Sequence, residues 1–173
     1  MSTRLALGGI TAVLRQVLRN GVADLAAIVG APVSVSAVAP DTINLQDAAA
    51  VPTLNLFLHR ISPNAGWRNA NLPSFGSDGA QAQSPPLALD LHYLLTAYGK
   101  TDLQAEILLG SGMQVLHERP WLTRDTIRDA LAAVPLDHLP PETLDQADGI
   151  KISLEPMGTD DLSRLWSAMQ AHY

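Results

Sequence analysis

The chain has 173 residues, of which 47% are hydrophobic and 16% charged, with no cysteine and a net charge of −6. This size and balance predict one globular domain with a buried core, and the lack of cysteine excludes thiolate metal sites and thiol nucleophiles. Acidic residues outnumber the 11 scattered lysines and arginines. We therefore expect no nucleic-acid partner, because phosphate binding requires a basic surface.

The N-terminal apolar stretch is predicted to form an amphipathic helix. Its apolar residues recur at helical spacing: Ile10, Val13, Leu14, Val17 and Leu18. A signal peptide is disfavoured, because the stretch runs into Arg15 and Arg19 without a small-residue cleavage site. No apolar segment reaches the ~20 residues that a membrane span requires. We therefore expect a soluble protein without membrane insertion.

Three strands follow in the chain. Residues 33–38 alternate valine or alanine with serine, residues 53–61 alternate leucine with other side chains, and residues 87–98 alternate most clearly of all. Between the last two strands, residues 62–86 are rich in Ser, Gly, Asn, Gln and Pro and show no apolar period. They are predicted to form a long loop, and loops of this length tend to be functional or mobile.

The second half of the chain is predicted to be mostly helical. One helix spans residues 103–117, capped by Thr101 or Asp102, and a shorter one capped by Thr123 ends at Ala133. A short helix at 142–148 and a strand at 150–154 follow. Thr159 begins a last helix with a predicted buried stripe: Leu162, Leu165, Trp166 and Met169.

These elements predict a single α+β (mixed α/β) domain over residues 1–173. We expect a sheet of about four strands packed with about four or five helices. The order lacks the regular βαβ alternation of a doubly wound sheet. Within the helix at 103–117, Gly110-Ser111-Gly112 has no nucleophile-elbow context, so a helix-packing or kink role is favoured.

Catalytic chemistry has one weak candidate, a cluster of His59, Asp90 and His92. The three lie in two strands that would bring them together if the strands pair antiparallel. A polar sheet face with cross-strand hydrogen bonds is the favoured interpretation. We therefore expect no enzyme and no catalytic, metal-binding or cofactor-binding residue. A hydrolase using these three groups and a small-molecule-binding domain are the alternatives from other classes.

A protein interface is the stronger hypothesis for the long loop. Trp and Arg are the residue types most enriched at interface hot spots, and Trp67-Arg68 stands in this loop. The alternative is that Trp67 tucks the loop onto its own domain. The candidate interface comprises Arg60, Asn64, Trp67, Arg68, Asn69 and Phe75.

Several long segments resemble, in collinear order, the cap or tail-terminator proteins of extracellular contractile injection systems, which are phage-tail-like particles. These segments are residues 54–69, 85–99, 104–110, 113–118, 150–152 and 162–170. The resemblance implies a fold similar to phage tail terminators and a structural role without catalytic residues. A baseplate or adaptor part of the same particle is the alternative.

The resemblance also implies partners and a location. Such caps form a homohexameric ring at the baseplate-distal end, where the ring terminates the inner tube and anchors the last sheath layer. The particle would be assembled in the bacterial cytoplasm and then retained or released. The family is expected to continue into another strand, whereas this chain stops at Tyr173; a strand supplied elsewhere, a shorter subgroup and a truncated chain are the three alternatives.

Overall fold

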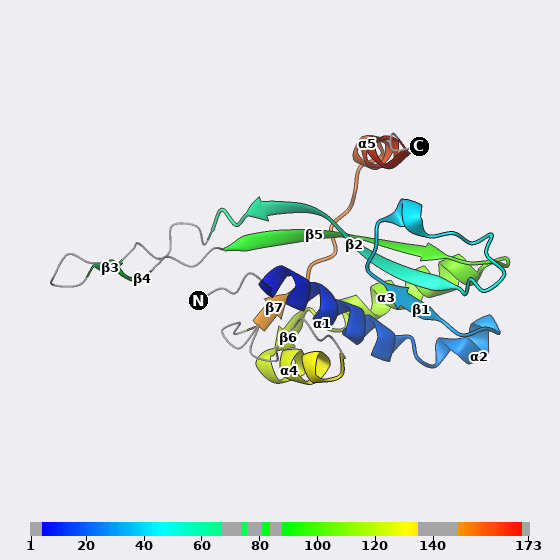
Figure 1. Ribbon diagram of the computed structural model, residues 1–173, viewed down its shortest axis with the longest axis horizontal. Coiled ribbons are helices and arrows are strands. Elements are labelled where there is room, and N and C mark those ends of the chain that lie inside the picture. Colours follow the sequence, from blue (N-terminus) through cyan, green and yellow to red (C-terminus); the bar gives the residue numbers. More distant parts are fainter. Residues whose placement is uncertain (1–4, 67–73, 76–80, 84–87, 135–148, 171–173) are drawn as a thin grey trace.

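A three-stranded sheet organises the computed structural model, which describes residues 5–66, 74–75, 81–83, 88–134 and 149–170 (Figure 1). Its strands are β1 (Ser34–Ser36), β2 (Thr53–Pro63) and β5 (Leu89–Tyr98), in the order β1-β2-β5. β1 runs parallel to β2, and β5 runs antiparallel to it. All three strands predicted from alternating residues are thus present and adjacent.

β2 and β5 form a long two-stranded ribbon, here called the β2–β5 ribbon. They pair from Thr53↔Tyr98 to Pro63↔Leu89, with a register shift between Leu58 and Arg60. A bulge of this kind places an extra residue in one strand and re-aims the side chains beyond it. Figure 1 shows the ribbon running past the helices toward one end of the molecule.

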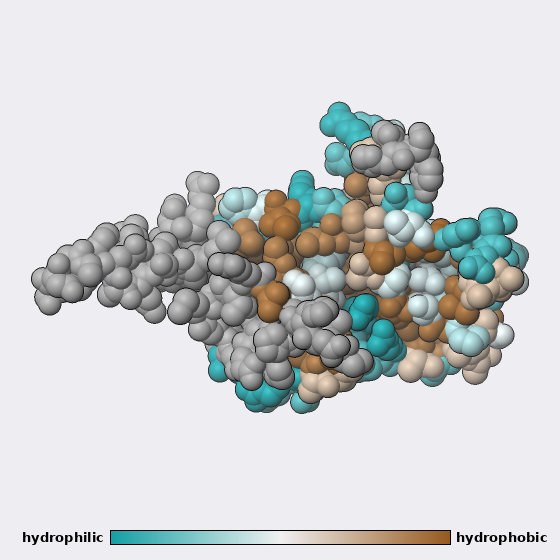
Figure 2. Space-filling view, viewed as in Figure 1, coloured by the Kyte–Doolittle hydropathy of each residue, from teal (hydrophilic) through white to brown (hydrophobic). Residues whose placement is uncertain are grey.

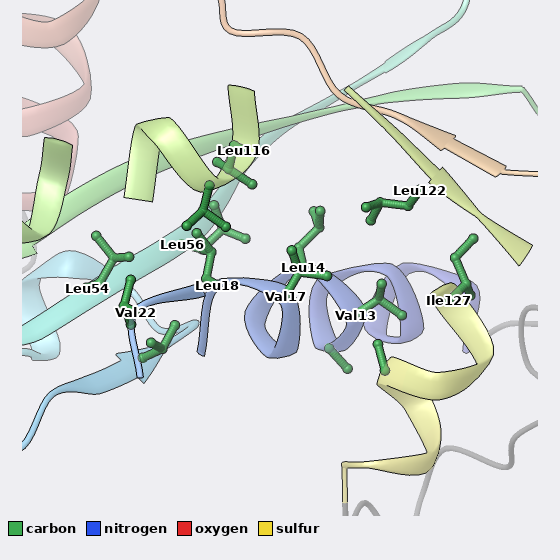
Figure 3. Packing of buried hydrophobic residues seen from close by; sticks show 14 of the residues in the cluster. Val13, Leu14, Val17, Leu18, Val22, Leu54, Leu56, Leu116, Leu122 and Ile127 are labelled. Atoms are coloured by element: carbon green, nitrogen blue, oxygen red, sulfur yellow. The ribbon is translucent and has the colours of Figure 1, made fainter. Parts of the chain in front are cut away.

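Helices α1 (Ala6–Gly21) and α3 (Gln104–His117) cover one face of the sheet. The predicted stripe of α1 is confirmed, since Val13 and Leu18 are fully buried. It packs on Leu54 and Leu56 of β2 and on Leu108, Val115 and Leu116 of α3 (Figure 3). Burial of this apolar surface is the main term that stabilises the fold.

A second, smaller layer lies against α1. It contains α4 (Arg124–Ala132) and a two-stranded ladder of β6 (Trp121–Thr123) and β7 (Gly149–Lys151). Leu122 and Ile127 anchor this layer in the core. The predicted cap of α4 is confirmed, because Thr123 Oγ1 accepts a hydrogen bond from the backbone N–H of Thr126 at 3.4 Å.

The α+β class is confirmed, but the strands are distributed differently from the expectation. The strand expected at 150–154 is the shorter β7, which pairs with β6 and not with the main sheet. Within the predicted 62–86 loop, β2 continues to Pro63, and β3 (Ser74–Phe75) pairs with β4 (Gln81–Gln83). The helix predicted at 142–148 lies outside the described residues.

The expected cap of α3 is wrong. Neither Thr101 nor Asp102 caps the helix; Leu103 precedes it in the left-handed conformation, at φ 63°, without a side-chain cap. The turn is held by Gln104, whose Oε1 accepts from the backbone N–H groups of Lys100 at 2.9 Å and Thr101 at 3.1 Å. The side chain of the first helical residue therefore accepts hydrogen bonds from two backbone N–H groups of the turn that precedes the helix.

Three further helical elements complete the described chain. α2 (Leu25–Val29) and the 3₁₀ turn η1 (Pro40–Thr42) occupy segments for which we predicted no separate helix. α5 (Thr159–Gln170) forms as expected. Its predicted buried stripe is only partly covered, because the helix stands apart from the main body and contacts η1 (Figure 1).

Candidate interface at the end of the β2–β5 ribbon

Polar side chains gather beyond the bulge of the β2–β5 ribbon. This cluster, here called the ribbon-end cluster, consists of His59, Arg60, Ser62, Asn64, Asp90 and His92. The strand register brings its members together, because Arg60 lies opposite His92 and Ser62 lies opposite Asp90. Residues that are directly opposite share one face of an antiparallel sheet.

His92 is the centre of the cluster. Its Nε2 lies 2.9 Å from Ser62 Oγ. Arg60 Nη2 lies 3.3 Å from Nδ1 and 3.4 Å from Nε2 of the same ring. Glu155, from the segment that leads to α5, places Oε2 3.8 Å from His92 Nδ1. A residue distant in the sequence thus joins the sheet to the C-terminal segment.

His59 is the neighbouring imidazole, and its environment disfavours a second positive charge. The two histidine rings meet edge to face with centroids 6.4 Å apart. Burial, the guanidinium of Arg60 and the ring of His92 together lower the pKa of His59 below its ordinary value of 6.5. The cluster therefore holds neutral His59 beside cationic Arg60.

The chemistry available here is hydrogen bonding across strands. The arrangement has the order of a serine-hydrolase relay, with a serine, a histidine and a carboxylate: Ser62, His92 and Glu155. It differs from such a relay because 71% of the Glu155 side chain is exposed and because Arg60 lies against both ring nitrogens of His92. Asp90 does not join them, because its Oδ1 accepts from Asn64 Nδ2 at 2.7 Å. Among the described residues no three His, Asp or Glu side chains are arranged to hold a metal ion. The favoured interpretation, a polar face with cross-strand bonds, describes this geometry.

The predicted interface residues are only partly covered by the structure. Arg60 is exposed and Asn64 partly exposed, and both belong to the ribbon-end cluster. Trp67, Arg68 and Asn69 lie outside the described residues. Phe75 lies in β3, but its side chain is also outside the described part. Their role in an interface stays a prediction.

Ser62 and Glu155 were not among the predicted site residues. For Ser62 the sequence carries a usable signal, because it lies in a strand paired with the strand of His92. For Glu155 the sequence carries no such signal, since its approach to His92 depends on how the segment after β7 crosses the sheet. Tertiary packing alone brings it there.

A cavity of about 260 Å³ lies elsewhere, between α1, α4 and the segment that follows α3. It is lined by Val17, Asn20, Arg119, Thr126, Asp129 and Ala130. None of the predicted site residues whose side chains the structure describes contributes to it. Within the described residues, no helix is both long and apolar enough to cross a membrane.

Comparison with known protein families shows which family the chain belongs to. The model of the Pvc16 N-terminal domain matches residues 9–173. The chain belongs to the Pvc16 N-terminal domain family. Pvc16 is a phage-tail-like protein of the Photorhabdus virulence cassette, and the family suggests a component of a contractile injection system.

Membership in the Pvc16 N-terminal domain family confirms the resemblance at the level of contractile injection systems. No match was found among curated proteins or among solved structures. The Pvc16 match spans the α+β body and the β2–β5 ribbon alike, because it runs from α1 through α5. The ribbon-end cluster is therefore part of the matched domain.

Proposed function

We propose that this chain is the cap, or tail terminator, of a contractile injection system. In this role a homohexameric ring closes the baseplate-distal end of the particle, ends growth of the inner tube and anchors the last sheath layer. The partners are other copies of the chain and the tube and sheath proteins. The role is structural and involves no catalysis, nucleic acid or membrane insertion.

One observation carries the proposal: the match to the Pvc16 N-terminal domain over residues 9–173. The match covers nearly all of the described body, which supports a particle component that acts through contacts with its neighbours. The resemblance of the sequence segments to tail terminators supplies the specific position in the particle. Assembly in the bacterial cytoplasm, before any release of the particle, belongs to the same proposal.

The shape of the subunit supports a ring. A closed ring is built from heterologous contacts, in which two different surfaces of each subunit meet. The β2–β5 ribbon runs toward one end of the molecule, and α2 lies near the other end (Figure 1). Exposed apolar side chains mark that second end, with Ile28 66% and Leu103 60% exposed. Two unlike, well-separated surfaces are what such a ring requires.

Deletion of the gene in its producing strain, followed by electron microscopy of the particles, tests the proposal. The expected result is tubes of uncontrolled length, or sheaths that assemble poorly or slip from the tube. Complementation with the wild-type gene should restore uniform length. Normal particles would overturn the cap role. Particles that lack a baseplate would identify the alternative, a baseplate or adaptor part.

A further inference from the structure

Leu103, in the turn before α3, combines a strained backbone with an exposed apolar side chain. Its φ of 63° lies in the left-handed region, which a bulky residue rarely adopts. Gln104 fixes this turn, because its Oε1 accepts from the backbone N–H groups of Lys100 and Thr101. Glycine or asparagine would fit the turn at a lower cost. Leucine stands there instead and is 60% exposed, and strain kept at an exposed position is typical of a functional surface.

Ile28 of α2 extends this apolar surface and is 66% exposed. Gln104 Nε2 donates to the carbonyl of Val29 at 2.9 Å, which ties the start of α3 to the end of α2. Figure 2 shows hydrophobic residues at the end of the molecule where Figure 1 places α2. Two exposed carboxylates border the apolar pair, one next to Leu103 in the sequence and one a helical turn before Ile28. We call these four residues the α2–α3 patch: Asp24, Ile28, Asp102 and Leu103.

The outer face of the β6–β7 ladder is aromatic and basic. Trp121 is 52% exposed, and its indole lies over Gly149, where an added Cβ would clash with the ring. Lys151 is exposed and lies directly opposite Trp121, so the two side chains share one face. An indole that is held against the backbone and still half exposed is a preformed anchor for an interface. We call Trp121, Gly149 and Lys151 the ladder face.

The two surfaces are unlike, complementary and well separated. Among the large hydrophobic residues that the structure describes, Ile28, Leu103 and Trp121 are the three most exposed. The α2–α3 patch adds two carboxylates to its apolar pair, and the ladder face adds an ammonium group to its indole. In Figure 1, α1 runs from the region of β7 to α2, and its 16 residues span about 24 Å. The rigid helix keeps the surfaces of one copy apart, so each can meet the other kind only in a second copy.

We propose that the α2–α3 patch of one copy docks on the ladder face of the next copy. Ile28 and Leu103 pack on the indole of Trp121, and Lys151 lies against the two carboxylates of the patch. Each copy contributes one surface of each kind, so the contact is heterologous and can repeat around a closed ring. The inference rests on the proposed function, because it assigns the self-contact of the ring to two named surfaces.

Mixing two variants of the purified full chain tests this contact. Leu103→Asn removes an apolar anchor from the α2–α3 patch, and Lys151→Glu reverses the charge of the ladder face. Native mass spectrometry should show that each variant alone associates at least about tenfold more weakly than the wild type. An equimolar mixture should form 1:1 heterodimers and nothing larger, because the mixture retains one intact surface of each kind.

Other outcomes contradict the pairing of these surfaces. A wild-type chain that stays monomeric at every concentration at which it is soluble would overturn the inference. Oligomers that either variant leaves intact, or a mixture without heterodimers, would do the same. A dimer formed by Lys151→Glu alone would mean that α2–α3 patches meet each other, as in a two-fold contact.

Thermal unfolding separates the loss of association from a loss of folding. At a concentration where the wild type is monomeric, Leu103→Asn should raise Tm by about 2–4 °C, because asparagine tolerates the left-handed conformation. A lowered Tm would assign Leu103 to the fold and remove it from the interface. Met113→Gln is the matched control, since Met113 is 45% exposed on α3, and it should associate within about twofold of the wild type.

The mixing experiment and the gene deletion fail independently. Normal particles after deletion would remove the cap role and leave the contact measured on the purified chain in place. Failure of the mixing experiment would remove only the pairing of the α2–α3 patch with the ladder face.

Discussion

Gly112 of α3 lies directly over Leu54 of β2. A Cβ built on Gly112 would stand 2.8 Å from Leu54 Cδ2 and 3.2 Å from its Cδ1, and Leu54 is fully buried. The glycine therefore lets the helix approach the centre of the sheet. Of the two roles favoured for Gly110-Ser111-Gly112, helix packing is confirmed at this position.

Alanine at the two glycines of α3 should have opposite effects. Gly112→Ala forces Leu54 to shift in a filled core, which should lower the free energy of unfolding by about 1–2 kcal/mol. Gly110 is exposed, and a Cβ added there would meet no atom within 4 Å. Gly110→Ala should therefore raise stability by about 0.5–1 kcal/mol, because alanine is the better helix former. Urea denaturation of both variants measures the difference, and a stabilised Gly112→Ala protein would contradict the packing.

Asn55 should be a large contributor to stability despite being polar. Its side chain is 0% exposed, and its Oδ1 accepts from Ser36 Oγ at 2.8 Å and from Val38 N–H at 3.1 Å. Its Nδ2 donates to the carbonyl of Val38 at 3.0 Å. Asn55→Leu leaves both backbone groups of Val38 without these partners, so we expect a loss of about 2–4 kcal/mol in the free energy of unfolding.

Asn44 provides the matched control for Asn55. It is exposed, and its Oδ1 accepts from the backbone N–H of Gln46 at 2.8 Å. Asn44→Leu should cost less than about 1 kcal/mol, because water replaces the lost contact. Both variants are measured by urea denaturation at the same pH. Equal losses at the two positions would show that burial of the Asn55 side chain does not matter.

The ribbon-end cluster should make stability depend on pH through His59. Because the pKa of His59 is lowered from 6.5 in the folded chain, the unfolded chain binds more protons as the pH falls through 6.5 toward the folded-state value. The free energy of unfolding therefore keeps the full contribution of neutral His59 above this pH window and loses it as the pH falls through the window. His59→Gln should show a smaller loss of stability between pH 7.5 and pH 5, measured by urea denaturation.

Removing the charge of Arg60 tests the causes given for the lowered pKa of His59. Burial is the largest cause of the lowered pKa of His59, followed by Arg60 and His92. Arg60→Gln should raise the pKa of His59 without restoring the ordinary value of 6.5, since burial remains. Proton NMR of the imidazole follows the titration directly. A wild-type midpoint at or above 6.5 would rule out the proposed environment.

The loop prediction is tested through assembly. Trp67→Ala together with Arg68→Ala should weaken ring formation or docking while leaving the monomer folded, because these residue types dominate interface energies. Native mass spectrometry measures assembly, and circular dichroism measures folding. Arg128→Ala, an exposed arginine on α4, serves as the control. Assembly equal to wild type would remove Trp67 and Arg68 from the interface.

Local periodicity predicted much of the fold. Apolar residues at helical spacing identified α1, and alternating residues identified β2 and β5, because these patterns are properties of neighbouring residues. Thr123 was recognised as a cap for the same reason, since its hydrogen-bond partner, Thr126, is three residues away. The candidate site was predicted only in part, through Arg60, Asn64, His59, Asp90 and His92.

The sequence by itself determined the α+β class, the main helices and strands, and a resemblance confirmed at the level of contractile injection systems. Only the tertiary structure decided the partners of Asn55, the approach of Gly112 to Leu54, and the contact of Glu155 with His92. Each of these joins residues far apart in the chain. Their proximity follows from strand register and helix packing, which depend on the whole fold and leave no local pattern.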